Sequence, residues 1–234
     1  MAVFADHLVG TIGGGHLEHQ AVTLARQVLD GTAACPSEQT VPLGPSLGQC
    51  CGGVVQLSYQ RISQADLAAL TPRLLPVREP VALFGGGHVG RALVQVLSPL
   101  PFALRWIDSR DEVFPSHLPE NVTSEHADPV QSAVAELAPQ SRVLIMSFSH
   151  AEDLDILAAC LKRQQTQGDL PYIGLIGSAT KWAKFRHRLQ ARGFSEQDLA
   201  WVTTPIGLPT IKSKSPEVIA VSVAAQLLSW MPTP

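Results

Sequence analysis

The feature that most constrains the fold is a glycine-rich turn at residues 85–90, Gly-Gly-Gly-His-Val-Gly, in a chain of 234 residues. An apolar run at residues 81–84 precedes the turn and an amphipathic segment at residues 89–97 follows it, which predicts a strand, a turn and a helix. In this setting glycines let the backbone approach a phosphate, and the helix N-terminus supplies amide donors and positive potential. Asp108 ends the next apolar run, where it would accept a hydrogen bond from a ribose hydroxyl.

We therefore predict that a phosphate-bearing ligand binds at this turn. The alternative is a glycine turn that serves only tight packing of the strand against the helix. The predicted ligand contacts are Gly85, Gly87, His88, Gly90 and Asp108.

Strand-like and helix-like segments alternate after residue 80, which predicts the α/β class with a parallel sheet covered on both faces. The predicted strands are residues 81–84, 102–108, 143–148, 172–176 and 200–203, and the predicted helices are residues 89–97, 130–137, 152–162, 181–192 and 216–228. Three prolines interrupt residues 71–80, where we expect no regular element and place a linker. The predicted organisation is a smaller N-terminal α+β domain (residues 1–70), the linker (71–80) and a C-terminal Rossmann-like domain (81–234).

A second glycine turn lies in the N-terminal domain at residues 10–15, ahead of a predicted helix. Successive glycine amides at the start of a helix can surround an anion. Gly13, Gly14 and Gly15 are therefore candidate ligand contacts, although a tight turn alone would have the same spacing. After a proline-containing loop, a strand is predicted at residues 54–59.

Two adjacent thiols lie in a flexible loop, Gln49-Cys50-Cys51-Gly52-Gly53. A thiolate among amide donors would be reactive or would bind a soft metal. The alternative is a small core residue, and this is the interpretation we give to Cys35 and Cys160.

Further candidates follow the later strands, where ligands of α/β sheets bind. His150 follows the strand predicted at residues 143–148, and Ser178 follows the next strand along the chain. Lys181 lies in the first turn of the helix after Ser178. His150, Ser178 and Lys181 are therefore predicted to face the ligand.

Composition excludes several classes of function. A net charge of −3 and 6% aromatic residues argue against binding to nucleic acid. The N-terminus does not resemble a signal peptide, the longest apolar stretch is too short to span a bilayer, and the cysteines have no disulfide-like spacing. We therefore expect a cytoplasmic protein that binds neither nucleic acid nor membranes.

Recognisable catalytic motifs are missing from the sequence. Residues 16–19, His-Leu-Glu-His, do not fit the H-E-x-x-H metal motif, and a solvated first helical turn explains them better. No nucleophile elbow, P-loop or Tyr-x-x-x-Lys pair is present. A binding protein is therefore favoured over an enzyme, and the alternative is an NAD(P)-dependent oxidoreductase that uses residues 85–90 and Asp108.

Taken together, these motifs resemble the xanthine dehydrogenase accessory protein family (XdhC/CoxI-like). The resemblance covers nearly the whole chain, and its paired GTIGGG and CCGG signatures are distinctive. The segments that carry it are residues 10–18, 47–53, 83–90, 149–150 with Asp155, 174–178 with Lys181, 185–186, 205–208 and 215–222.

The resemblance implies a carrier of the molybdenum cofactor (molybdopterin) rather than an enzyme. Such a protein protects the cofactor while a cysteine desulfurase provides its terminal sulfur, and then delivers it to a xanthine dehydrogenase-type molybdenum enzyme. By this resemblance the chain is expected to form a homodimer. Gln49 and Cys51 are expected to contact the cofactor, and Cys51 is the candidate metal ligand, through the molybdenum.

The sequence departs from the family pattern in two places. Family members carry several dozen more residues before the GTIGGG segment, so Val3 and Phe4 are expected to lack a partner strand. Residues 212–214, Lys-Ser-Lys, replace the Gly-Ala-Arg/Lys turn that is usual in the family, so this turn is not assigned to the ligand.

Overall fold

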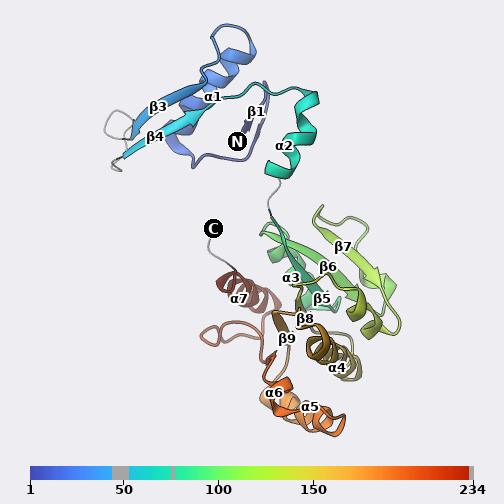
Figure 1. The fold of residues 1–234 in the computed structure, drawn as a ribbon. Helices are drawn as coiled ribbons and strands as arrows, with labels where there is room; N and C mark the ends of the chain where they lie inside the picture. Colours follow the sequence, from blue (N-terminus) through green and yellow to red (C-terminus); the bar gives the residue numbers. More distant parts are fainter. Residues whose placement is uncertain (44–52, 75–76, 232–234) are drawn as a thin grey trace. The chain divides into compact units, whose positions relative to one another are not determined.

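The structure is a computed structural model that describes residues 1–43, 53–74 and 77–231. The chain divides into two compact units, Met1–Leu75 and Pro76–Pro234, which are labelled by element in Figure 1. Gln49, Cys50 and Cys51 lie outside the described residues.

The second unit is built on a six-stranded sheet with the order β10-β9-β8-β5-β6-β7. All neighbouring strands are parallel. The chain winds outward from β5 in one direction and from β8 in the other, so the topological switch point lies between β5 and β8. The α/β prediction with a Rossmann-like domain is confirmed. The strands are β5 (Glu79–Phe84), β6 (Phe102–Asp108), β7 (Val122–His126), β8 (Arg142–Ile145), β9 (Tyr172–Leu175) and β10 (Val202–Thr203).

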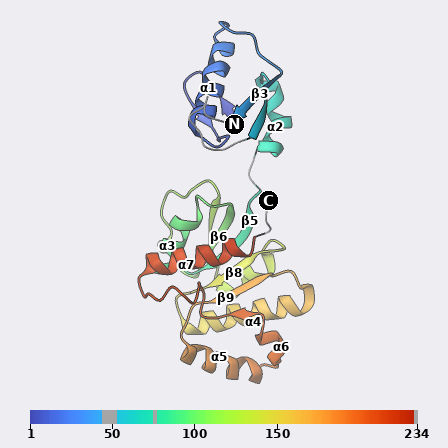
Figure 2. The same cartoon turned by 90° about the vertical axis from the view of Figure 1, so that its left-hand side faces the viewer.

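Helices cover both faces of this sheet, and the side chains of β5 show why. Val81 and Leu83 contribute to one core with α3 and α7. Ala82 and Phe84 point to the opposite face and contribute to a core with η4, α4 and α5, as the two-residue period of a strand requires. Figure 2 shows α3 and α7 side by side. The helices are α3 (His88–Leu97), α4 (His150–Gln167), α5 (Ala179–Ala191), α6 (Glu196–Leu199) and α7 (Pro216–Ser229), with 3₁₀ turns η3 (Asp111–Val113) and η4 (Val130–Glu136).

The structure differs from the sequence prediction at several elements. The helix predicted at residues 130–137 is the 3₁₀ turn η4, and the strand predicted to reach Phe148 ends at Ile145. Ser147 leaves the ladder because both its amide and its hydroxyl donate to Asp153 Oδ1, at 2.8 and 2.7 Å. Edge strand β7 was missed because its sequence, Val-Thr-Ser-Glu-His, is mostly polar.

The first unit is smaller and has a small core. Helix α1 (Gly15–Leu29) packs Leu17 against Val41 of the antiparallel hairpin β3 (Glu38–Leu43) and β4 (Gly53–Ser58). Strand β3 was predicted as a loop because it contains Pro42, which a two-stranded hairpin tolerates since each strand has a free edge.

The remaining elements of this unit also correct the prediction. Val3 does have a partner strand, because β1 (Ala2–Val3) pairs with β2 (Leu8–Val9) in antiparallel register. After the 3₁₀ turn η2 (Gln64–Asp66), helix α2 (Leu67–Leu74) enters the segment 71–80, and β5 begins inside it at Glu79. The expectation of no regular element there was therefore wrong at both ends.

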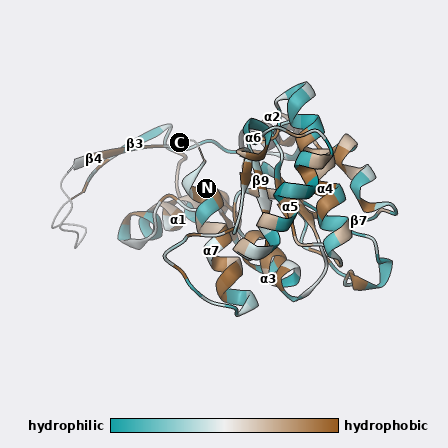
Figure 3. Ribbon diagram, turned by 90° about the horizontal axis from the view of Figure 1, so that it is seen from below, coloured by the Kyte–Doolittle hydropathy of each residue, from teal (hydrophilic) through white to brown (hydrophobic). Residues whose placement is uncertain are grey.

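Helix α7 is apolar on almost all sides, as Figure 3 shows. Its inner face includes the buried side chains of Ala220, Val223 and Leu227, while Val218 and Val221 are exposed on the outer face. None of the described helices is long and apolar enough to cross a membrane.

Candidate functional site

The glycine turn after β5 lies at the switch point, and packing explains two of its glycines. A Cβ at Gly85 would lie 2.0 Å from the carbonyl oxygen of Met146, and Gly85 has a φ of 129°. A Cβ at Gly90 would lie 2.0 Å from the carbonyl oxygen of Gly85. That oxygen also accepts a hydrogen bond from the indole of Trp106 at 2.9 Å. Gly85 and Gly90 are therefore required for the tight strand–helix packing, whatever else the turn does.

Asp108, at the end of β6, holds the turn in place. Its buried carboxylate accepts a hydrogen bond from the Gly86 amide at 2.5 Å. Arg110 donates to both carboxylate oxygens, from Nε at 2.9 Å and from Nη2 at 3.0 Å. Burial raises the pKa of Asp108, but the hydrogen bonds from Arg110 and Gly86 outweigh burial and hold it below its usual value. The residue predicted to accept from a ribose thus already holds an amide and a guanidinium.

Gly87 is the glycine of this turn that faces open space. It is the N-cap residue of α3, with a φ of −72° and no side-chain hydrogen bond to the helix amides. No atom lies within 4 Å of where its Cβ would be. The neighbouring helices differ, because Ser149 Oγ accepts from the Glu152 amide and Ser178 Oγ accepts from the Lys181 amide, each at 3.2 Å.

This contrast distinguishes the N-terminus of α3 from those of α4 and α5. The first amides of a helix have no intrahelical acceptor. At α4 and α5 a serine hydroxyl satisfies one of them, whereas at α3 no side chain does. His88, the first residue of α3, is exposed beside these amides. Among the described residues, the N-terminus of α3 is therefore the one of these three that no side chain caps, so an anion could take the place of the cap there.

Lys181 is held inside the carboxyl edge of the sheet. Its ammonium donates to Asp153 Oδ2 at 2.6 Å and to the Ile176 carbonyl at 2.8 Å. Both side chains of the ion pair are almost fully buried. His150 lies near this pair but is exposed, and its ring meets Phe185 edge-on at 6.3 Å. Of the two predicted contacts, Lys181 is thus engaged internally and His150 is accessible.

Three side chains at this edge were missed by the sequence analysis. Phe148 is 65% exposed, and the Arg110 guanidinium lies 4.3 Å from the centre of its ring. Glu152 Oε1 accepts from Ser109 Oγ at 2.7 Å, and its Oε2 is buried without a hydrogen-bond partner in the described part of the chain. An apolar aromatic residue directly after a core strand was the available signal, but Phe148 was assigned to the strand itself.

The first glycine turn is occupied by a side chain of the protein. The Glu18 carboxylate accepts from the amides of Ile12 and Gly14, at 2.8 and 3.2 Å, and from the Thr11 hydroxyl. These hydrogen bonds, with Thr11 first, hold the pKa of Glu18 below its usual value. Gly13, Gly14 and Gly15 all have positive φ, so the predicted anion nest exists and an internal carboxylate fills it.

The thiols that the structure describes have opposite environments. Cys160 is fully buried on α4, as predicted, and burial raises the pKa of its thiol to about 12. Cys35 is exposed, so its assignment to the core was wrong. Cys35 lies in the segment that connects α1 to β3, and most residues of this segment are exposed. Within the described residues, no group of three or more His, Cys, Asp or Glu side chains could hold a metal ion.

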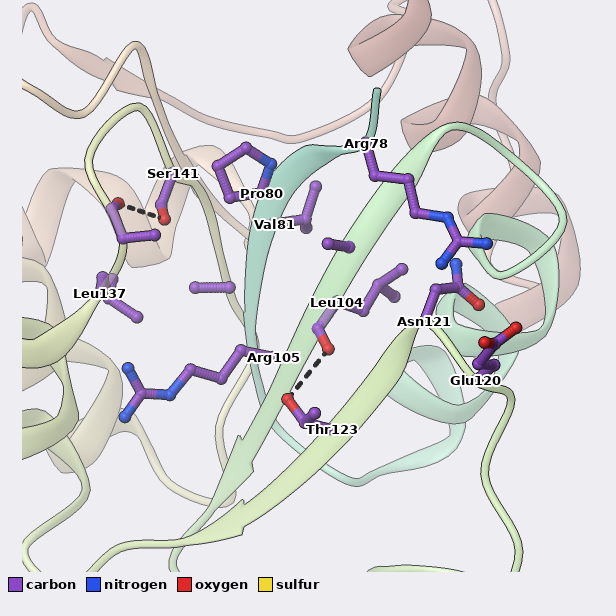
Figure 4. A pocket seen from close by; sticks show the side chains of 13 residues that line it. Arg78, Pro80, Val81, Leu104, Arg105, Glu120, Asn121, Thr123, Leu137 and Ser141 are labelled. Carbon is purple, nitrogen blue, oxygen red and sulfur yellow. Dashed lines mark hydrogen bonds between the residues drawn. The ribbon is translucent and has the colours of Figure 1, made fainter. Parts of the chain in front are cut away.

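A cavity of about 360 Å³ lies at the opposite, amino edge of the sheet (Figure 4). It opens where the small residues Pro80, Ala82 and Ala103 line one face. Several polar groups of its wall bind the protein itself. Ser141 donates to the Ala138 carbonyl at 2.6 Å, and Arg105 donates to Glu125. This cavity lies at the amino ends of the strands and is therefore separate from the switch point.

Comparison with known proteins agrees with the motifs and the fold. The XdhC Rossmann domain matches residues 81–227, and the XdhC and CoxI family matches residues 1–38. YqeB of Escherichia coli (strain K12), described as uncharacterized, is 27% identical over 238 residues, which cover 97% of this chain and 39% of that protein. A solved structure described as a xanthine dehydrogenase from Bacillus halodurans has a TM-score of 0.53 at 21% identity, covering 92% of this chain and 64% of that one.

The chain thus spans less than half the length of YqeB and less than two thirds of the Bacillus halodurans chain. At 21% identity the structural likeness supports the fold alone. One family match falls in each unit, and the match to residues 81–227 includes most of the Rossmann domain. The chain belongs to the XdhC family.

Proposed function

We propose that the protein binds the molybdenum cofactor and carries it during maturation of a xanthine dehydrogenase-type enzyme. Membership of the XdhC family supports this role. In this proposal the terminal sulfur is added by a cysteine desulfurase while the cofactor is held, and the carrier acts as a homodimer in the cytoplasm.

The N-terminus of α3 carries the proposal. The cofactor's pterin bears a phosphate, and the amides that follow Gly87 offer it free donors and the positive end of a helix dipole. The open space at Gly87 is what close approach of a phosphate requires. His88 and His150 are exposed at the same edge of the sheet and are proposed to contact the ligand.

A carrier fits the two buried aspartates of this edge better than a catalyst does. In the described residues, the carboxylates of Asp108 and Asp153 are each paired with a cation, Arg110 and Lys181. A general base needs a carboxylate that is free to take a proton from a substrate. We propose that these pairs shape the binding site, and that Lys181 and Ser178 support it through Asp153 and the capped α5.

The test replaces Gly87 with valine. The φ of −72° suits any residue and an added Cβ has no atom within 4 Å, so the melting temperature should stay close to that of the wild type. The side chain would stand where the phosphate must reach the amides. Protein purified from molybdenum-replete cells should then retain at least about tenfold less molybdenum and pterin, a loss of about 1.4 kcal/mol in binding.

Ala135→Val is the matched control. Ala135 is exposed on η4, so this substitution places a valine side chain on the surface away from the carboxyl edge. It should retain the wild-type amounts of molybdenum and pterin. Equal retention by folded Gly87→Val would remove the turn from ligand binding. Bound NAD(P) in place of pterin would favour the oxidoreductase alternative.

Cys51 is proposed to contact the cofactor through its molybdenum, with Gln49 beside it and Cys50 less important. Cys51→Ser should lower the molybdenum content or the sulfuration of the delivered cofactor, and Cys50→Ser should have the smaller effect. Unchanged molybdenum content together with unchanged activation of a client enzyme would exclude Cys51 from the mechanism.

A further inference from the structure

The order of the strands places Phe148 and Arg110 on either side of the glycine turn. Strand β5 lies between β8 and β6, and the glycine turn follows β5. Phe148 follows β8 and Arg110 follows β6, yet the Arg110 guanidinium lies 4.3 Å from the centre of the Phe148 ring. Their contact therefore bridges the carboxyl end of β5, beside the N-terminus of α3.

Arg110 is held in a fixed orientation at this position. Asp108 accepts from its Nε and its Nη2 through two different oxygens, which fixes the plane of the guanidinium as well as its position. Its Cζ lies over the ring of Phe148. The side chain is still 28% exposed, so part of the guanidinium is open to solvent. A planar cation held in this way is a surface on which a flat ring can stack.

Glu152 supplies an acceptor next to this pair. It lies in the first turn of α4, close enough for its charge to raise the pKa of Arg110, after the larger effects of Asp108 and Glu112. Only one of its carboxylate oxygens has a partner, Ser109 Oγ. The other is buried without one among the described residues. An unpaired buried carboxylate oxygen is costly, and an N–H donor from a ligand would remove that cost.

We infer that Arg110 and Phe148 form a stacking platform for the flat, amino-bearing heterocycle of the ligand whose phosphate lies at the N-terminus of α3. The heterocycle stacks on the guanidinium, and its amino group donates to Glu152 after a rotation of that side chain. The inference rests on the proposed function, since it extends the phosphate site toward the ring. A pterin and a nucleobase share this chemistry.

An exposed aromatic ring covered by an arginine could also be a purely structural pair. The two roles differ in what they predict for ligands. A structural pair affects all ligands of the folded protein alike, or none. A stacking platform affects ligands that carry a ring and leaves inorganic phosphate unchanged.

The test measures binding by calorimetry with three probes, namely neopterin monophosphate, AMP and inorganic phosphate. Arg110→Lys keeps the charge but loses the planar face, and Phe148→Ala removes the ring beneath it. Stacking of a ring on such a platform is worth about 1 to 3 kcal/mol, so each variant should weaken the preferred ring-bearing probe by about tenfold or more. Binding of inorganic phosphate should stay within about twofold of the wild type, less than 0.5 kcal/mol.

Phe148→Tyr is the conservative control and should bind as the wild type does. Tighter binding of neopterin monophosphate than of AMP would identify a pterin as the ligand, and the reverse order would identify a nucleotide. Ring-bearing probes that bind equally to wild type, Arg110→Lys and Phe148→Ala would overturn the platform while leaving the phosphate site intact. No binding of any probe to the wild type would overturn the proposed function as well.

Discussion

The same four residues, Gly-Gly-Gly-His, occur at residues 13–16 and 85–88, and the two turns have different uses. In the first, the carboxylate of Glu18 fills the nest of amides. In the second, Asp108 takes the Gly86 amide but leaves the helix N-terminus beyond Gly87 without a side-chain cap. A glycine turn is therefore an anion site only where the protein has not supplied the anion itself.

The largest expected difference between the turns concerns packing. Gly90→Ala would place a Cβ 2.0 Å from a carbonyl oxygen and should reduce the free energy of unfolding by about 3 kcal/mol. Gly14→Ala meets no atom, but Gly14 has a φ of 77° and a ψ of −167°, a backbone conformation used almost only by glycine, so about 2 kcal/mol is expected from backbone strain.

Urea denaturation separates the two effects. All four tryptophans lie in the second unit, so their fluorescence follows its unfolding, while the NMR signals of α1 amides follow the first unit. A loss in Gly90→Ala no larger than that in Gly14→Ala would contradict the close packing inferred at Gly90.

Glu18→Gln tests the filled nest through its pH dependence. The pKa of Glu18 is lowered from 4.5 in the folded protein, so its ionised form stabilises the first unit above about pH 4.5, and this contribution is lost as the pH falls through the folded pKa. The stability difference between wild type and Glu18→Gln should therefore shrink below pH 4.5, as followed by NMR. In Glu18→Ala, which removes the side chain that fills the nest, the amides of Ile12 and Gly14 should gain weak sulfate binding. A difference that stays constant down to pH 2 would contradict this account.

The smallest stability effect is expected at the open turn, from Gly87→Ser. Its backbone is extended (φ −72°, ψ −172°), as an N-cap requires, so a serine should change the stability of the second unit by only a few tenths of a kcal/mol. By contrast, Ser149→Ala and Ser178→Ala should each cost about 1 kcal/mol. The new hydroxyl would occupy the donors that the ligand needs, so binding should weaken in a protein that is no less stable. Unchanged binding would mean that the ligand does not use these amides.

The two units also differ in how much of their structure could be predicted from the sequence. The second unit was largely predictable because its strands are apolar runs with turns between them, and β6 was predicted at its observed bounds. Strand β3, with Pro42, and the polar edge strand β7 were not predicted. Edge strands are less buried, so their sequences lack the apolar pattern that indicates a strand.

For the site, the glycine turn was predictable because spacing and context are local properties. The capture of Glu18 by the first turn and the pairing of Asp108 with Arg110 were not, because each depends on where a side chain turns after folding. Phe148 was missed for the related reason that the end of β8 is set by the hydrogen bonds of Ser147 to Asp153.

The buried thiol of Cys160 can serve as a labelling probe for the opening of the second unit. With a pKa raised to about 12 and no solvent contact, this thiol cannot react with an alkylating reagent while α4 stays packed on the sheet. In a chain whose other cysteines are replaced by serine, each alkylation event therefore records one opening of that interface. When alkylation is slower than reclosing, the labelling rate gives the free energy of opening. A ligand bound at the carboxyl edge would lower this labelling rate in proportion to its occupancy.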